Sequence, residues 1–175
     1  MNKTEVKMEV ISWIKTIGVA VLLAVVINMV LIVNAEVPTG SMKNTIMEED
    51  RIVALRTSYW FDKPERGDIV VFRYPDDPTG ETLFVKRIMG VGGDELYMED
   101  GILYRNGEAL EESYIMEEMQ GDFGPITVPE EMYFMMGDNR NDSLDSRAWD
   151  NKFVEEGEIL GKVVWRYFRG FKVLS

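Results

Sequence analysis

The sequence contains no cysteine and no histidine among its 175 residues. Without cysteine, the chain has no disulfide, no thiol nucleophile and no zinc–thiolate site. Without histidine, it cannot form a Ser-His-Asp triad or an imidazole-ligated metal site. An enzyme made from this chain and working near neutral pH must take its general base from a carboxylate, a lysine, a tyrosine or an amino terminus.

Positive charge is also scarce, because 19 Lys and Arg residues face 31 Asp and Glu residues, for a net charge of −12. The first 36 residues hold three lysines and three glutamates, so the whole deficit belongs to the remainder. A phosphate backbone would be repelled by such a surface. We therefore expect no nucleic-acid partner, and the length suits one ordinary domain.

Long apolar runs are rare too, and the main one lies near the start, at residues 17–33 (IGVAVLLAVVINMVLIV). With two apolar residues just upstream it reaches the roughly 17–25 residues that a membrane-spanning helix needs. Three lysines precede the run and no Lys or Arg follows before Lys43. The positive-inside rule then places the N-terminus in the cytoplasm. We predict a cytoplasmic segment at 1–16, a transmembrane anchor at 17–35 and an extracytoplasmic domain at 36–175.

A cleavable signal peptide is the alternative for this segment. It has a basic start, an apolar stretch and the small-residue exit Val33-Asn34-Ala35. The apolar stretch is longer than the usual ~7–15 residues of such peptides, so we favour an uncleaved anchor.

The remaining chain shows short β-type runs separated by turn residues. We predict strands at 51–56, 68–74, 83–89, 102–105, 132–136 and 159–168, with long loops at 75–82 and 111–125. Asn106-Gly107 between apolar residues is the strongest short hairpin signal available. The pattern predicts a mainly β, barrel-like fold.

The segment PTGSMKNTI, just after the apolar run, presents Ser41 behind Pro38 and Gly40. Pro38 restricts the backbone and Gly40 permits close approach, so the serine can expose its hydroxyl and amide. Thr39 can turn its hydroxyl to the place where an oxyanion would form. From Val33, Ser41 is at most about 29 Å away along an extended chain, so it would act on chains at the membrane surface.

Lys86 lies in LFVKRIMGVGGD, where side-chain alternation puts it on one strand face with Phe84 and Ile88. Large apolar neighbours would desolvate the ammonium and lower its pKa, which a lysine base needs. Lys43 is the rival base, but its polar surroundings offer no reason for a lowered pKa. We prefer Lys86.

The segment GDNRNDSLDSR, residues 137–147, is dense in Asp, Asn, Ser and Gly, which suits a loop of Asx-turns. Asp145 and Arg147 can form a buried pair, and Ser143 can hydrogen-bond a neutral lysine. The D-x-D-x-D-G spacing of a calcium loop is missing, and we expect no metal or cofactor.

Together and in this order, these segments resemble type I signal peptidase, the bacterial leader peptidase. PTGSMKNTI resembles its nucleophile box, RGDIVVF a core strand box, VKRIMGVGGD its lysine box, and GDNRNDSLDSR its last box. The resemblance covers nearly the whole chain and implies the compact, single-anchor form. It also implies an SH3-like, barrel-type antiparallel β assembly.

The resemblance implies a membrane-bound serine endopeptidase that removes signal peptides with Ala-x-Ala exits from exported pre-proteins through an acyl-enzyme. Ser41 would be the nucleophile and Lys86 the general base. Thr39 with the Ser41 amide would form the oxyanion hole. Ser143 would orient the lysine, and Asp145 and Arg147 would support the site. A Ser/Lys pair needs no imidazole, in agreement with the absence of histidine.

Two positions depart from the family pattern, since Asn44 and Gly92 each stand where proline is usual. Both changes are expected to loosen loops and to leave the reacting groups intact. A non-catalytic binding domain that keeps the fold is the competing function; the presence of both reacting groups speaks against it. The sequence does not show which pre-proteins are cut or the oligomeric state.

Overall fold

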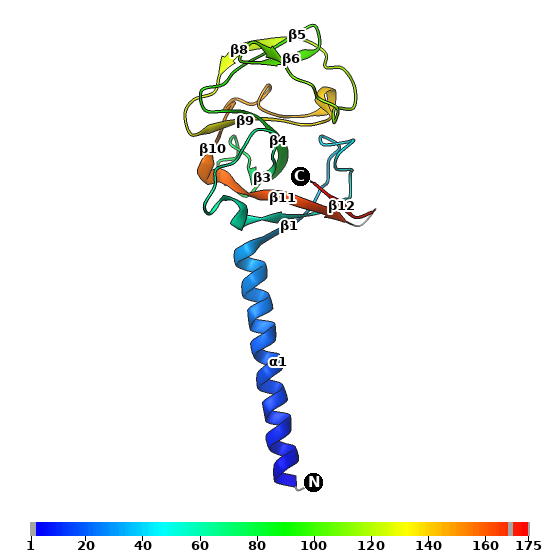
Figure 1. Cartoon of the computed structure of the whole chain (residues 1–175), viewed down its shortest axis with the longest axis vertical. Coiled ribbons are helices and arrows are strands. Elements are labelled where there is room, and N and C mark those ends of the chain that lie inside the picture. Colours follow the sequence, from blue (N-terminus) through cyan, green and yellow to red (C-terminus); the bar gives the residue numbers. More distant parts are fainter. Residues whose placement is uncertain (1–2, 168–169, 175) are drawn as a thin grey trace.

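The computed structural model describes residues 3–167 and 170–174. Its one α-helix in these ranges, α1 (Lys3–Leu31), extends away from a β-rich domain (Figure 1). Residues Lys7–Leu31 are long and apolar enough to cross a membrane, with a mean hydropathy of 2.4, and none of this stretch is buried by the domain. A helix satisfies all its backbone hydrogen bonds internally, which a lipid environment requires.

The helix ends at Leu31, before the predicted end of the anchor at residue 35. Ile32–Glu36 instead form strand β1, which pairs antiparallel with β2 (Arg51–Leu55) from Ile32↔Leu55 to Glu36↔Arg51. Cleavage after Ala35 would therefore remove most of an edge strand from the domain. The division of the chain at residue 35 stays a prediction.

The domain contains two antiparallel sheets. The first has the order β1-β2-β11-β3-β4-β9-β10, with β12 paired to β11, and the second has the order β7-β6-β5-β8. The second sheet lies at the end of the domain opposite α1 (Figure 1). The strand bounds are β3 (Ile69–Arg73), β4 (Leu83–Val91), β5 (Glu95–Glu99), β6 (Ile102–Arg105), β7 (Glu108–Ala109), β8 (Phe123–Thr127), β9 (Met132–Met136), β10 (Val154–Glu155), β11 (Ile159–Tyr167) and β12 (Lys172–Val173). The described residues also form three short 3-10 helices, η1 (Arg56–Tyr59), η2 (Arg140–Asp142) and η3 (Glu156–Glu158).

The prediction of a mainly β fold with one N-terminal helix is confirmed. Each of the six predicted strands is present within one or two residues of its predicted bounds, apart from Phe168, which lies outside the described residues. Six strands fall outside the predicted ranges, namely β1, β5, β7, β8, β10 and β12, although the Asn106-Gly107 hairpin signal precedes β7. The predicted loop at 111–125 was wrong at its end, because β8 begins at Phe123.

Buried apolar side chains fix the two elements that carry Ser41 and Lys86, namely the turn after Ser41 and strand β4. Met42 and Ile46, on either side of the turn after Ser41, are fully buried with Ile52 and Val71. On the other side of β4, Ile88 packs in a second cluster with Trp149. Apolar burial therefore fixes both the turn and the strand, since each fully buried side chain of this size stabilises its position by about 1.5–3 kcal/mol.

Gly161 gives a direct test of this packing. A Cβ at Gly161 would lie 2.7 Å from the carbonyl oxygen of Leu55 and 3.1 Å from the amide nitrogen of Arg56, both of them backbone atoms. We expect Gly161→Ala to destabilise the domain by about 1–3 kcal/mol in chemical denaturation. Gly157→Ala is the control, because no atom lies within 4 Å of the added methyl group. Equal stability of the two variants would contradict the packing described.

Candidate active site

Ser41 lies in the loop that joins β1 to β2. The amide of Lys43 donates to the carbonyl of Gly40 at 3.0 Å, and the amide of Ile46 donates to that of Met42 at 2.8 Å. These bonds wind residues 40–46 into a tight turn that the buried Met42 and Ile46 hold against the core. Ser41 is itself buried, with 8% of its surface exposed.

Lys86 lies in the middle of β4, where it pairs with Val70 of β3. Its side chain runs to Ser41, and Nζ donates a hydrogen bond to Ser41 Oγ at 2.5 Å. Only 4% of the lysine is exposed, and Nζ lies 5.4 Å from the centroid of the Phe84 ring. The structure therefore brings together the two residues that the sequence analysis paired.

The charge of the Lys86 ammonium is disfavoured by its surroundings. The pKa of Lys86 is lowered to about 8; burial is the largest cause and the nearby Arg147 adds to it, while Asp145 and Asp138 act in the opposite direction. Both carboxylates are already neutralised, Asp145 by Arg147 at 2.8 Å and Asp138 by Arg87 at 2.6 Å. Because each carboxylate has its own guanidinium, neither holds a proton on the lysine by direct pairing, and desolvation dominates.

Lys43, the alternative candidate for the base, pairs with an acidic side chain and not with Ser41. Its Nζ forms an ion pair with Glu48 at 3.1 Å. No hydrogen bond joins Lys43 to the Ser41 hydroxyl in the described part of the chain, whereas Lys86 makes one.

An open cleft of about 490 Å³ adjoins the serine and the lysine. Thr39 lines it, and its Oγ1 lies 3.5 Å from Ser41 Oγ. The apolar side chains of Leu83, Val85 and Leu144 also line the cleft. A larger cavity of about 930 Å³ lies between residues 73–80 and 150–158, but neither Ser41 nor Lys86 borders it.

The loop at residues 137–147 is hydrogen-bonded to the backbone of the turn at residues 40–46. The amide of Asn139 donates to the carbonyl of Ser41 at 3.0 Å, and Asn139 Nδ2 donates to that of Gly40 at 3.0 Å. Gly137 makes this approach possible, because a Cβ there would collide with the Ser41 carbonyl oxygen and with Ser143 Oγ. The loop thus fixes the backbone that carries the Ser41 hydroxyl.

The expected ion pair between Asp145 and Arg147 is present and doubly bonded, with both nitrogen–oxygen distances at 2.8 Å. Asp145 also accepts from the amide of Gly137 at 3.0 Å. Ser143 Oγ is buried beside Gly137, and it has no hydrogen-bond partner among the described residues. A role for Ser143 in orienting Lys86 stays a prediction.

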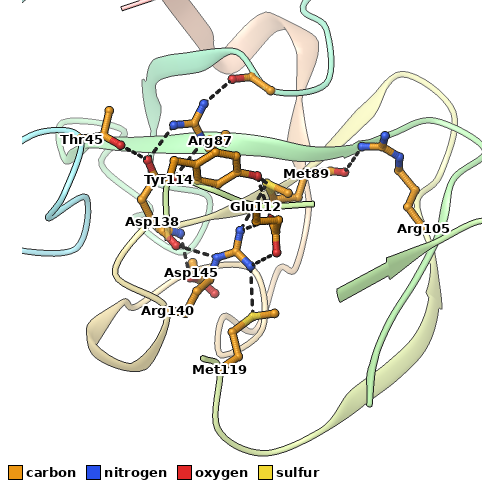
Figure 2. A network of polar contacts seen from close by, with 12 residues as sticks. Thr45, Arg87, Met89, Arg105, Glu112, Tyr114, Met119, Asp138, Arg140 and Asp145 are labelled. Atoms are coloured by element: carbon orange, nitrogen blue, oxygen red, sulfur yellow. Dashed lines mark hydrogen bonds and ion pairs between the residues drawn. The ribbon is translucent and has the colours of Figure 1, made fainter. Parts of the chain in front are cut away.

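A second buried cluster of polar side chains includes Asp138 and Arg87, the residue next to Lys86 (Figure 2). Arg87 makes a two-pronged contact with Asp138, at 2.8 and 2.6 Å, and Thr45 Oγ1 donates to the same carboxylate at 2.5 Å. Thr45 belongs to the nucleophile turn and Arg87 follows the lysine, so Asp138 ties the two elements together. The sequence analysis did not predict that Asp138 and Asn139 would hold the turn, although both residues lie in the segment GDNRNDSLDSR.

A buried hydroxyl in contact with a desolvated amine, beside an open cleft, is the geometry of a serine hydrolase that uses lysine as its base. The family model described as signal peptidase, peptidase S26, matches residues 10–168. The chain belongs to this family.

Individual relatives agree with the family match. A probable signal peptidase I-2 from Synechocystis is 38% identical over 157 residues, covering 88% of this chain and 71% of that protein. A signal peptidase I from Bacillus licheniformis is 37% identical over 156 residues, covering 83% and 82% of the two chains. A crystal structure of a signal peptidase I from Enterococcus faecalis is 34% identical, with a TM-score of 0.50, and covers 58% of this chain and 97% of that one.

The buried amine should cost stability, and this cost can be measured. Folding lowers the pKa of Lys86 from 10.5 to about 8, so below pH 8 the folded state carries a penalty of up to about 3 kcal/mol. We expect Lys86→Met to stabilise the domain at pH 7 in chemical denaturation of the detergent-solubilised protein. The advantage should shrink between pH 8 and 10.5, because there the unfolded parent binds more protons than the folded parent, whose stability rises.

The control for this measurement is Lys63→Met, since 68% of the Lys63 side chain is exposed. That variant should show no comparable gain. A Lys86→Met protein that is less stable than the parent at pH 7 would contradict the desolvated amine.

Proposed function

We propose that this chain is a membrane-anchored signal peptidase in which Ser41 is the nucleophile and Lys86 the general base. Family membership supports removal of signal peptides from exported pre-proteins. The observation that carries the residue assignment is the hydrogen bond of 2.5 Å between Lys86 Nζ and Ser41 Oγ.

The reaction begins with Lys86 in its neutral form, which a pKa of about 8 makes available near neutral pH. The amine takes the proton of the Ser41 hydroxyl as Oγ attacks the carbonyl carbon of the scissile peptide bond. The resulting ammonium gives that proton to the leaving amine, which departs as the new N-terminus of the mature protein. Lys86 then takes a proton from a water molecule as the water oxygen attacks the acyl ester, and the ammonium returns that proton to Ser41 Oγ as the signal peptide leaves with a new carboxyl end.

Negative charge develops on the attacked carbonyl oxygen, and two donors on the same short segment can stabilise it. The Thr39 hydroxyl, whose oxygen lies 3.5 Å from Ser41 Oγ, and the Ser41 amide are the groups we assign to this role. Donors that are already in place cost no reorganisation during the reaction. Asp145 and Arg147 hold the loop that supports them.

The cleft and the anchor suit a substrate at the membrane surface. Apolar side chains of Leu83, Val85 and Leu144 narrow the cleft beside the dyad, which fits an extended chain with small side chains of the Ala-x-Ala type. Helix α1 leads directly into β1, which holds the domain next to the bilayer. The substrates would therefore be pre-proteins that are still tethered in the membrane by their signal peptides.

A cleavage assay tests the assignment. The detergent-solubilised parent should cut a pre-protein with an Ala-x-Ala exit, whereas Ser41→Ala and Lys86→Ala should lose at least roughly 10³-fold in kcat/KM, because these groups act as a unit. Lys43→Ala is the matched control and should stay close to the parent. Equal cleavage by all four proteins would defeat the catalytic assignment.

The pH dependence of kcat/KM gives a separate prediction for the same proteins. Because the base must be neutral, the rate should rise through pH about 8, the pKa of Lys86, and level off above it. A rate that rises only above pH ~10 would mean that the lysine is not desolvated in the free enzyme.

We also place the N-terminus in the cytoplasm and the catalytic domain outside, on the strength of the lysines that precede the apolar run of α1. A membrane-impermeant protease added to intact spheroplasts should then degrade the domain and leave a protected fragment of α1. Protection of the domain until the membrane is permeabilised would reverse the orientation.

A further inference from the structure

The loop between β7 and β8 returns from the second sheet to the active site. Residues 112–115 of this loop, which we call the strap, touch all three segments that build the site. These are the turn after Ser41, strand β4 and the loop at 137–147. The strap belongs to none of the motifs that carried the catalytic assignment.

Asn44 joins the strap to the nucleophile turn. Its Nδ2 donates to the carbonyl of Tyr114 at 3.0 Å and approaches that of Ile115 at 3.4 Å. The backbone of Asn44 is left-handed, with φ of 83°, a conformation that asparagine tolerates better than most residues. Proline, usual here in the family pattern, fixes φ near −65° and has no donor. This chain therefore holds the turn by a different device.

Tyr114 joins the strap to the strand that carries the base. The guanidinium of Arg87, the residue next to Lys86, lies 3.9 Å from the centroid of the Tyr114 ring (Figure 2). The Tyr114 hydroxyl donates to Glu112 at 2.7 Å. Cation–π contact with a partly desolvated guanidinium favours this arrangement.

Glu112 joins the strap to the loop at 137–147. Its carboxylate accepts two hydrogen bonds from the fully buried side chain of Arg140, at 2.8 and 2.5 Å. Arg140 Nε in turn donates to the carbonyl of Gly137 at 3.0 Å. A buried, bidentate pair of this kind is rigid, so the strap is a fixed point against which the turn can be held.

We propose that Asn44 is a positioning residue, through which the strap holds the turn of Ser41 at the distance from β4 that lets Ser41 Oγ meet Lys86. The proposal rests on the proposed function. Asn44 lies on the surface, so its replacement leaves the core intact. Loss of its amide frees one side of the turn, and the fraction of molecules with the dyad in contact falls.

Three variants of the full-length protein test this role. Asn44→Gly keeps the left-handed backbone and removes the amide; Asn44→Asp also tolerates that backbone but turns a carboxylate toward two carbonyl oxygens. Asn106→Gly is the matched control, because Asn106 is another left-handed asparagine (φ of 55°), whose Nδ2 donates to Asp94 at 2.8 Å in a remote hairpin.

With an Ala-x-Ala peptide, kcat should fall roughly 5-fold in Asn44→Gly and roughly 10-fold in Asn44→Asp, with KM within about 2-fold of the parent. The Asn106→Gly control should keep the kcat of the parent. A kcat for Asn44→Gly equal to that of the parent or to that of the control would overturn the proposal. If the asparagine amide had only a structural role, its loss would change kcat to the same extent at both sites.

Hydrogen exchange separates failure of this proposal from failure of the proposed function. Amides of residues 41–46 should exchange faster in Asn44→Gly than in the parent, while those of β3 and β9 stay unchanged. Unchanged amide exchange at residues 41–46 would overturn the proposal that the strap holds the turn, even if the enzyme is active. If the parent cleaves no better than Ser41→Ala, the proposed function fails, and the exchange rates alone decide whether Asn44 holds the turn.

Discussion

The contact between the Lys86 amine and the Ser41 hydroxyl sets the constraint on the rest of the structure. The amine must be desolvated to lose its proton near neutral pH, yet the negative charges of Asp145 and Asp138 raise the pKa of Lys86 and so favour its protonated form. The structure resolves the conflict by giving each carboxylate an arginine of its own. The carboxylates can then organise the backbone around the dyad, and although both raise the pKa of Lys86, burial outweighs them and keeps it lowered to about 8.

Ser41 and Lys86, the proposed reacting residues, lie 45 residues apart in the chain, so their contact depends on what fixes the turn relative to the strand. Met42 and Ile46 anchor the turn in the core, Asn139 grips its carbonyls, and Asp138 bridges Thr45 to the strand. These restraints approach the turn from different directions. Displacements of about 1 Å at a catalytic group can cost roughly 100-fold in rate, so such redundancy has a functional value.

The sequence predicted the long strands well because their signals are local. Alternating apolar residues at 83–89 and the Asn106-Gly107 turn need no knowledge of their partners. Strand β1 begins inside the apolar run at residues 17–33, and β8 contains the turn-like pair Gly124-Pro125. Their pairing with β2 and β5 overrides the local preference. The expectation that Asn44 and Gly92 loosen their loops stays a prediction; the structure adds that Asn44 is hydrogen-bonded to the strap and that a Cβ at Gly92 would lie 2.9 Å from the Cα of Glu130.

By itself the sequence determined the chemistry that was possible: without histidine or cysteine, a serine enzyme needed another base, and the motifs put Ser41 and Lys86 forward. The sequence favoured Lys86 over Lys43 as the base, but only the tertiary structure showed Lys86 in contact with the Ser41 hydroxyl and Lys43 paired with Glu48, and it placed Asn139, Asp138 and the strap around the dyad. The physical reason is that residue type and spacing describe each segment alone. Desolvation, ion pairing and the reach of a side chain depend on neighbours that are distant in the chain, and folding alone brings these together.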